Sequence, residues 1–194
     1  ITSPVAWSIS EAREITSLAK KHHAALVTGS PVPWMQEFQV MKTRIDRNTV
    51  QSYYADGSCA NFCWYMPPIL ELAQMLVGSD VLQCSTHGMS WSADEDPLSI
   101  PPVMTHIEHQ PRVGKNESPI GIVSNWYGDP YRHWAKVHMD NDVIEQGALW
   151  EGFDKIEHDE HLWLPFLRIV DRAFETNVSP ESFEDIINKT AIML

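Results

Sequence analysis

Nine histidines and several acidic side chains give this 194-residue sequence groups that could bind a metal ion or transfer protons. The densest cluster is His158-Asp159-Glu160-His161, in which two imidazoles are three residues apart. Zinc proteases use a different helical spacing of two histidines around a glutamate. Acidic residues at the beginning of a helix also have a simpler role, because they stabilise the positive end of the helix dipole. We therefore predict no metal site in this cluster.

Histidines on expected strands fit a metal site no better. His106 and Glu108 share one face of a strand over residues 103–109, and His109 points to the other face. His133 and His138 are five residues apart, so a regular strand places them on opposite faces. These spacings do not meet the tetrahedral geometry of zinc. The sequence predicts no bound metal.

Aromatic and nucleophilic side chains give a second set of candidates. Apolar faces of a sugar ring could stack on aromatic rings, although core packing is the interpretation we favour. Cys59 and Cys63 have neither zinc-ribbon nor thioredoxin spacing and fit buried positions. The sequence contains no Gly-x-Ser-x-Gly motif of a serine hydrolase. The aromatic set is Tyr53, Tyr54, Phe62, Trp64 and Tyr65.

Composition limits the classes of partner. The formal net charge of −12, with no basic stripe, disfavours nucleic acid as a partner. No apolar run approaches the roughly 20 residues of a membrane helix, and no secretory signal pattern is present. Three cysteines cannot all pair within one chain, which favours a reducing, cytoplasmic location. We expect a globular chain of one large domain, or of one and a half small ones.

The opening residues predict a βαβ unit. Ser8 and Glu11 have the spacing of a capping box, and apolar residues follow at helical intervals from Ile9 to Leu18. A short strand is expected from Ala24 to Thr28. No glycine-rich phosphate loop occurs in the sequence, and both ends look cut. We interpret residues 1–34 as the remnant of a dinucleotide-binding domain.

The rest of the chain predicts an α+β fold. The large open sheet should be mostly antiparallel, with a meander in its later part and helices packed on one face. The other face, with Trp126, Trp134 and Trp150 on its strands, should favour a homo-oligomer. Helices are expected at 34–45, from Pro67 and Pro68 to Gly78, at 160–175 and from Ser179. Strands are expected at 50–55, 81–87, 103–109, 119–126, 133–139 and 143–150. A turn is expected at 56–58 and a loop at 89–102.

This order of elements, with four local patterns, resembles the glucose–fructose oxidoreductase and inositol dehydrogenase (Gfo/Idh/MocA) family. The resemblance implies an N-terminal Rossmann domain followed by a C-terminal α+β domain, here residues 35–194, whose open sheet commonly mediates dimerisation. It covers nearly the whole chain. The patterns are Ser3-Pro4-Val5-Ala6 with Ser10-Glu11-Ala12, Val27-Thr28-Gly29-Ser30, Trp64-Tyr65 through Leu76-Val77-Gly78, and the closing segments around His161 and Glu184.

The departures from the family pattern concern its chemistry. The Lys-Pro pair that lies near the nicotinamide matches Ser3-Pro4, so these two residues are the candidate cofactor contacts. Pro33 stands where an arginine is frequent. The histidine that acts as general acid and base matches Pro68, and the residue four before it is Trp64. Proline has no proton to give and serine supplies no cation, so the catalytic positions are lost.

Two functions follow from the resemblance. The chain is part of an NAD(P)-dependent oxidoreductase that acts on a sugar, inositol or related polyol, with NAD or NADP bound only in the intact parent protein. Alternatively, it is a non-catalytic dimerisation or ligand-binding module derived from that family. The candidate residues of the substrate cleft are Trp64, Tyr65, Glu71 and His161, and the last three could replace the missing catalytic groups. The chain alone is expected to be inactive.

Overall fold

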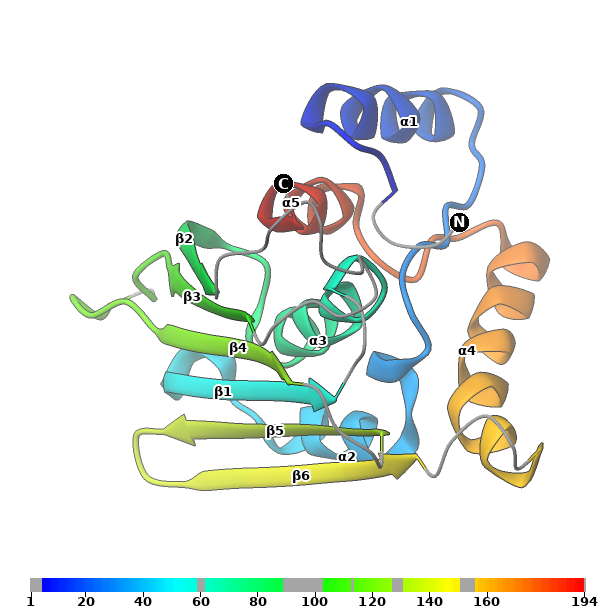
Figure 1. The fold of residues 1–194 in the computed structure, drawn as a ribbon. Helices are drawn as coiled ribbons and strands as arrows, with labels where there is room; N and C mark the ends of the chain where they lie inside the picture. The colour runs from blue at the N-terminus through cyan, green and yellow to red at the C-terminus, as the bar shows by residue number, and fades with distance from the viewer. Residues whose placement is uncertain are drawn as a thin grey trace, which may run out of the picture.

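Figure 1 shows the computed structural model, which describes residues 5–58, 62–88, 103–112, 114–126, 131–150 and 156–193. Helices and one six-stranded sheet make up an α+β fold, as the sequence predicts. In chain order the elements are α1 (Ile9–Lys21), η1 (Val32–Trp34), α2 (Gln36–Arg44), η2 (Arg47–Thr49), β1 (Val50–Ser58), α3 (Phe62–Val77), β2 (Val81–Gly88), β3 (Val103–His109), β4 (Ile120–Trp126), β5 (Tyr131–Met139), β6 (Val143–Trp150), α4 (Ile156–Thr176) and α5 (Phe183–Met193).

The sheet has the strand order β2-β3-β4-β1-β5-β6. Strand β1 runs parallel to β4, and the other four neighbouring pairs are antiparallel. The mostly antiparallel sheet is therefore confirmed, but the uninterrupted meander is wrong. Strand β1 lies between β4 and β5, so it separates the β3–β4 pair from the β5–β6 hairpin.

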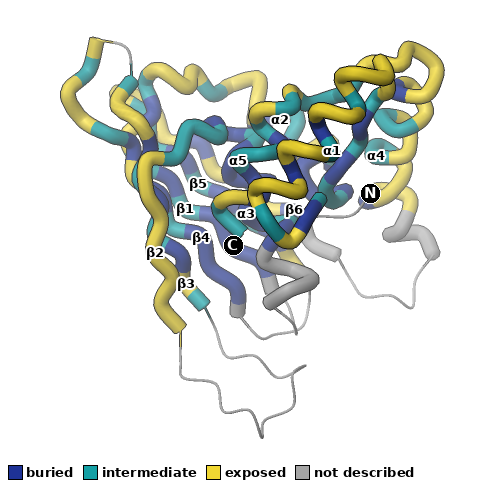
Figure 2. Tube along the Cα trace, turned by 90° about the horizontal axis from the view of Figure 1, so that it is seen from above, coloured by how far each residue is buried: buried dark blue, intermediate teal, exposed yellow. Residues whose placement is uncertain are grey.

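Helices cover one face of this sheet. Helix α3 packs on β1 and β4, and α2 packs on β6. Residues that point toward the helices, such as Tyr53, Ala55, Val123 and Val137, are buried. Figure 2 shows the buried residues gathered where helices and sheet meet. The opposite face carries no helix within the described residues.

Helix α1 begins at the predicted cap, where the hydroxyl of Ser8 accepts a hydrogen bond from the backbone N–H of Glu11. The predicted strand at 24–28 is wrong, because this segment has no strand partner among the described residues. Its backbone N–H groups bind side chains of the α4–α5 connection instead. Ala25 donates to Asn177 over 2.9 Å and Leu26 donates to Ser179 over 2.8 Å.

Two boundaries in the middle of the chain differ from the prediction. Residues 56–58 continue β1 instead of turning, because β4 pairs with all three of them and β5 with the first two. Helix α3 begins at Phe62, which places Pro67 and Pro68 inside its second turn. Each proline removes one backbone hydrogen bond, a loss that a helix tolerates best near its beginning. Gly78, with a φ of +121°, ends α3 as predicted.

The closing helices also begin elsewhere than predicted. Helix α4 begins at Ile156, so Pro165 lies in its interior. Helix α5 begins after Ser182, whose hydroxyl accepts the backbone N–H of Asp185 over 3.0 Å. Ser179 is not the cap, because its hydroxyl accepts the N–H of Leu26. The predicted loop at 89–102 lies outside the described residues. None of the described helices combines the length and apolar content that a membrane crossing needs.

Candidate functional site

Helix α3 carries the residue that matches the catalytic histidine of the resemblance. Its apolar residues Ile69, Leu72 and Leu76 are fully buried against the sheet, which fixes the rotation of the helix. Pro68 is half-buried in the second turn and presents no group that exchanges a proton. Glu71 follows within one turn and is buried as well. It is the titratable candidate on this helix whose side chain the structure describes.

Glu71 holds the turn that precedes η1. One carboxylate oxygen accepts the backbone N–H of Ser30 over 2.7 Å. Both oxygens lie 2.9 Å from the position that a Cβ on Gly29 would take, and Gly29 has a φ of +102°. Glycine is therefore required at this position for space and for backbone conformation. The geometry gives Glu71 an anchoring role.

A lysine from α5 completes this group. The Nζ of Lys189 lies 3.8 Å from Glu71 and 2.6 Å from Glu181, and its side chain is almost fully buried. We call Glu71, Glu181 and Lys189 the ion-pair cluster. Burial raises the pKa of Glu181 and outweighs the opposing effect of the Lys189 charge. The cluster joins α3, α5 and, through Ser30 and Thr28, the segment before η1.

Of the other predicted site residues, only His161 has a side chain that the structure describes. Ser3 and Pro4 lie outside the described residues. Trp64 and Tyr65 lie in the first turn of α3, but their side chains are outside the described part of the chain. His161 is exposed on α4, which stands at the end of the strands in Figure 1. Their roles in a substrate cleft remain predictions.

His133 is a buried titratable residue that the sequence reasoning considered only as a metal ligand. It lies opposite Gly57, where β1 ends and β5 begins. A Cβ on Gly57 would meet Ile69 of α3 at 2.8 Å and the His133 ring at 3.1 Å. Burial lowers the pKa of His133 to about 4, and its Nε2 has no hydrogen-bond partner within the described structure. Alternation along β5 was the available signal, because His133 shares a strand face with the apolar Ala135 and Val137, opposite to Arg132 and Lys136.

A second buried network crosses the sheet farther from this end of β1. The Tyr53 hydroxyl lies 2.9 Å from Nε2 of His109, whose Nδ1 lies 3.5 Å from Asp80. Arg112 binds the other Asp80 oxygen over 2.6 Å and the Val77 carbonyl over 2.8 Å. Burial raises the pKa of Tyr53 and keeps its hydroxyl protonated. The network ties β1 and β3 to the turn after α3.

Comparisons with known proteins identify the fold. No family model matches the sequence, and no curated protein matches it. Solved structures do match. A probable dehydrogenase of Thermotoga maritima has a TM-score of 0.78 at 11% identity, covering 99% of this chain and 67% of its own. A myo-inositol dehydrogenase of Corynebacterium glutamicum has a TM-score of 0.74 at 9% identity, with coverages of 99% and 67%.

A scyllo-inositol dehydrogenase of Lactobacillus casei, solved with NAD(H) and scyllo-inositol, has a TM-score of 0.71 at 8% identity. The match covers 97% of this chain and 66% of the scyllo-inositol dehydrogenase. This chain has the fold of the Gfo/Idh/MocA dehydrogenases. The resemblance drawn from the sequence is therefore confirmed at the level of the fold. The chain spans about two thirds of the length of the structures that it matches.

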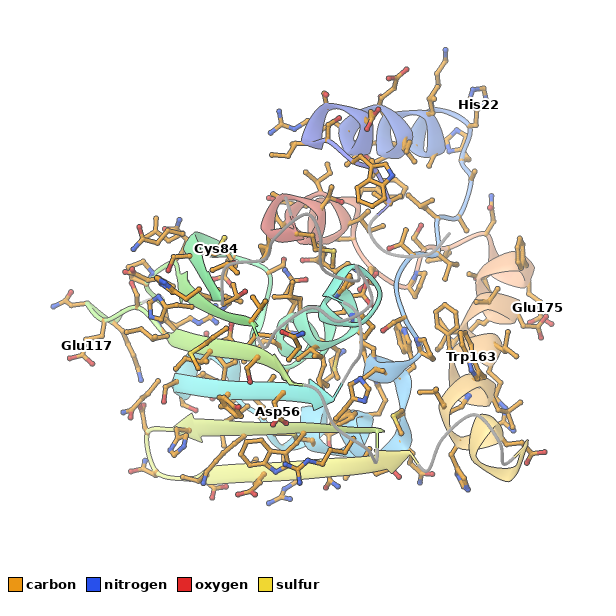
Figure 3. The ribbon with its side chains drawn as sticks, in the orientation of Figure 1. His22, Asp56, Cys84, Glu117, Trp163 and Glu175 are labelled. Atoms are coloured by element: carbon orange, nitrogen blue, oxygen red, sulfur yellow. The ribbon has the colours of Figure 1, made fainter. Side chains whose placement is uncertain are left out.

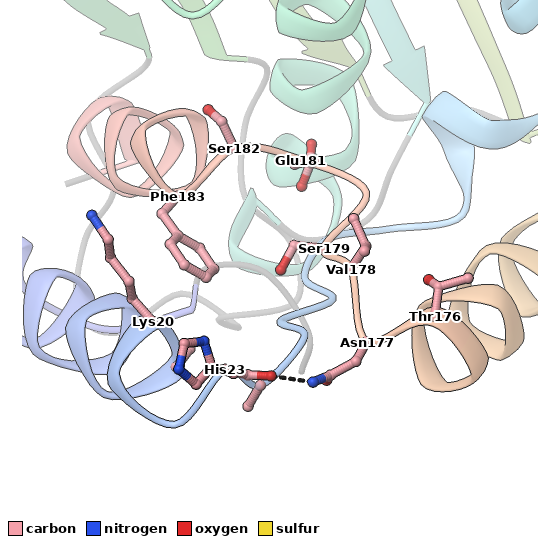
Figure 4. Close-up of a pocket in the computed structure, with 11 residues that line it drawn as sticks. Lys20, His23, Thr176, Asn177, Val178, Ser179, Glu181, Ser182 and Phe183 are labelled. Atoms are coloured by element: carbon pink, nitrogen blue, oxygen red, sulfur yellow. Dashed lines mark hydrogen bonds between the residues drawn. The ribbon is translucent and has the colours of Figure 1, made fainter.

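One pocket of this fold is lined neither by Pro68 nor by Glu71. It measures about 510 Å³ and opens between the end of α1 and the α4–α5 connection. Figure 4 shows Asn177 donating a hydrogen bond to the backbone carbonyl of His23 across its edge. Of the ion-pair cluster only Glu181 lines it. Within the described residues no group of three or more histidine, cysteine or acidic side chains could hold a metal ion.

Proposed function

We propose that this chain is the substrate-side part of an NAD(P)-dependent oxidoreductase that acts on a sugar, an inositol or a related polyol. The likeness to dehydrogenase structures over almost the whole chain carries this proposal. The ligand would bind near the first turns of α3, where β1 ends. Aromatic residues of α3 and a neutral His133 at this end of the sheet suit a polyol better than a charged substrate.

The residues of this chain do not fit a dinucleotide by themselves. Pyrophosphate groups bind glycine-rich turns at free helix N-termini, and the sequence has no such turn. At α1 and α5, serine hydroxyls already accept N–H groups of the first turn. NAD or NADP would therefore be held by a part of the parent protein outside these residues. When bound, that cofactor would supply the hydride chemistry.

A second function is a non-catalytic module that keeps the fold for ligand binding or dimerisation. Two observations favour it. Pro68 leaves the acid–base position without a proton, and Glu71 already binds Ser30 and lies close to Lys189. In this case the open face of the sheet would bind a second copy.

We also propose that the protein is cytoplasmic. This proposal rests on the unpaired, exposed Cys84 and on the odd number of cysteines.

Cofactor binding separates these functions. NADH and NADPH are titrated, with fluorescence as the readout, into this chain and into the natural protein that contains it. The oxidoreductase predicts saturable binding and turnover of a polyol by the natural protein, and neither by this chain. Binding without turnover of inositols or sugars would support the non-catalytic module. Tight binding by this chain alone would contradict both functions.

A further inference from the structure

Strand β2 forms one edge of the sheet and is exposed along its length. Among the described residues it pairs only with β3. All positions from 82 to 88 are exposed, and Figure 2 shows the strand as an uninterrupted exposed segment. Figure 3 labels Cys84 on it, at the rim of the molecule. An edge strand directs every second N–H and C=O group away from its one neighbour, where another strand can bind them.

The composition of β2 does not protect this edge. Proteins discourage strand pairing at an edge with charged side chains, prolines or bulges. The sequence from Val81 to Gly88 contains no charged residue and no proline, and its only register shift lies at its beginning. The opposite edge strand, β6, carries Glu145 and buries Ile144 and Ala148 under helix α2. Strand β6 is therefore better protected than β2 against pairing with a further strand.

A groove lies beside this edge on the helix side of the sheet. Leu82, Gln83 and Cys84 of β2 lie on one wall, and Asn188, Ala191 and Ile192 of α5 lie on the other. Its volume is about 190 Å³, which suits a side chain and is below the roughly 300 Å³ of small-molecule pockets. A strand added next to β2 would direct alternate side chains to this side of the sheet.

We propose that β2 binds an extended peptide as a seventh strand, with one apolar side chain of the peptide in the groove between β2 and α5. Main-chain hydrogen bonds give affinity in this mode of recognition, and the groove gives side-chain selectivity. The site does not depend on the proposed oxidoreductase function, because Pro68 and the ion-pair cluster do not line it.

Charge indicates the chemistry of the peptide. The chain carries a formal charge of −12, and the first turn of α5, at one end of the groove-forming helix, holds Glu184 and Asp185. A second copy paired through this same edge would bring its own Glu184 and Asp185 beside those of the first, and the two acidic pairs would repel each other. A neutral or basic peptide avoids this repulsion. The occupant is therefore an extended, non-acidic segment of another protein.

The test uses a fluorescent peptide in which valine and threonine alternate between terminal lysines. Fluorescence anisotropy measures its binding to the whole chain. The control peptide has the same sequence with alternate backbone nitrogens methylated, which removes the donors along one edge. We expect saturable binding of the first peptide and at least about tenfold weaker binding of the second. Equal binding of both, or no binding of the first, would overturn the proposal.

Three variants locate the site. Leu82→Lys places a charge on β2, and Ala191→Leu fills the groove from α5; each should weaken binding by about tenfold. Val143→Lys on the other edge strand is the matched control, since Val143 is 47% exposed and Leu82 52%. The control should bind as the parent does. An equal loss in Val143→Lys would overturn the assignment to β2, and so would a chain dimer that only Leu82→Lys dissociates.

Discussion

Two buried side chains near the position that matches the catalytic histidine, those of Glu71 and His133, have contacts that concern stability. Glu71 lies within one turn of the position that matches the catalytic histidine, yet it binds Ser30 and lies beside Lys189. His133 approaches the same part of α3 from the sheet and has no hydrogen-bond partner at Nε2 within the described structure. These contacts suggest tests at single residues.

His133 should make the protein sensitive to mild acid. Its pKa is about 4 in the folded chain and 6.5 when unperturbed, so the unfolded chain binds more protons between these values. The free energy of unfolding therefore falls as the pH decreases from about 6.5 toward 4. At about 1.36 kcal/mol per pKa unit, the loss approaches 3 kcal/mol. Urea unfolding of the parent and of His133→Phe at several pH values measures it.

The variant removes the titrating group but keeps a ring between Gly57 and Ile69. Its stability relative to the parent should rise as the pH falls. The raised pKa of Glu181 acts with the opposite sign, because it favours the folded state at low pH. This contribution is present in the parent and in the variant, so it cancels when their free energies of unfolding are compared. A pH-independent difference between the two proteins would show that His133 is not held neutral by burial.

Gly121 should be required by the ring of Tyr53. A Cβ at Gly121 would lie 1.9 Å from Cζ of Tyr53, so the ring would have to move. That movement also breaks its contact with His109. We expect Gly121→Ala to lower the free energy of unfolding by about 1–3 kcal/mol. The exposed Gly147 on β6 serves as the control, because Gly147→Ala meets Trp134 only at 3.2 Å. Equal effects would contradict this account.

At the scale of elements, strands were easier to predict than the ends of helices. Alternation of polar and apolar residues located all four strands after residue 102 within about two residues. The pattern did not show that β1 enters the sheet between β4 and β5, because this pairing is set by contacts far apart in sequence. Pro67 and Pro68 suggested a helix beginning, yet α3 starts five residues earlier, because a helix tolerates the loss of backbone hydrogen bonds near its beginning.

In the candidate site too, the sequence predicted what is local and did not predict contacts between distant elements. The resemblance located Pro68 and Glu71 on one helix, because their spacing is local in the sequence. It did not show that Lys189 from α5 approaches Glu71, or that His133 lies beside Ile69. Both contacts depend on how separate elements pack. The sequence signal for the ion-pair cluster was the position of Lys189 on the same helical face as Ile186 and Met193.

The ion-pair cluster should contribute strongly to holding α3 and α5 together. Lys189→Met leaves Glu71 and Glu181 buried without their cation, which should cost about 3–5 kcal/mol of stability. The deficit should shrink as the pH falls, because protonation of Glu181, whose pKa is already raised, relieves the unpaired charge. Denaturant unfolding at neutral and acidic pH measures both effects.

The control for this prediction is Lys115→Met. Lys115 lies 2.5 Å from Asp140 in a pair that is accessible to solvent. Such pairs contribute little to stability, so this variant should unfold nearly as the parent does at neutral pH. If Lys189→Met costs no more than Lys115→Met, the cluster does not join the two helices energetically.

At the scale of the whole molecule, the helices leave one broad face of the sheet uncovered within the described residues. Met104, Ile122 and Tyr54 share this face, and Trp134 packs edge-on against Tyr54 with ring centroids 5.4 Å apart. Ile120 and Met104 are exposed large apolar residues on it. The face also carries the Lys136–Glu145 ion pair and the hydrogen bond between Tyr54 and Ser124. A mixed apolar and polar surface of this kind is typical of an interface between subunits.

We therefore expect the chain to form a dimer at high micromolar concentration, with the two open faces packed about 10 Å apart. Met104→Lys and Ile120→Lys should each shift light scattering toward the monomer, because a lysine on either strand would be buried unpaired between the sheets. Val40→Lys, at an exposed position on α2 on the other side of the molecule, should leave the dimer intact. A parent chain that stays monomeric would contradict this interface. Dissociation by Val40→Lys but not by the two sheet variants would place the contact on the helical side.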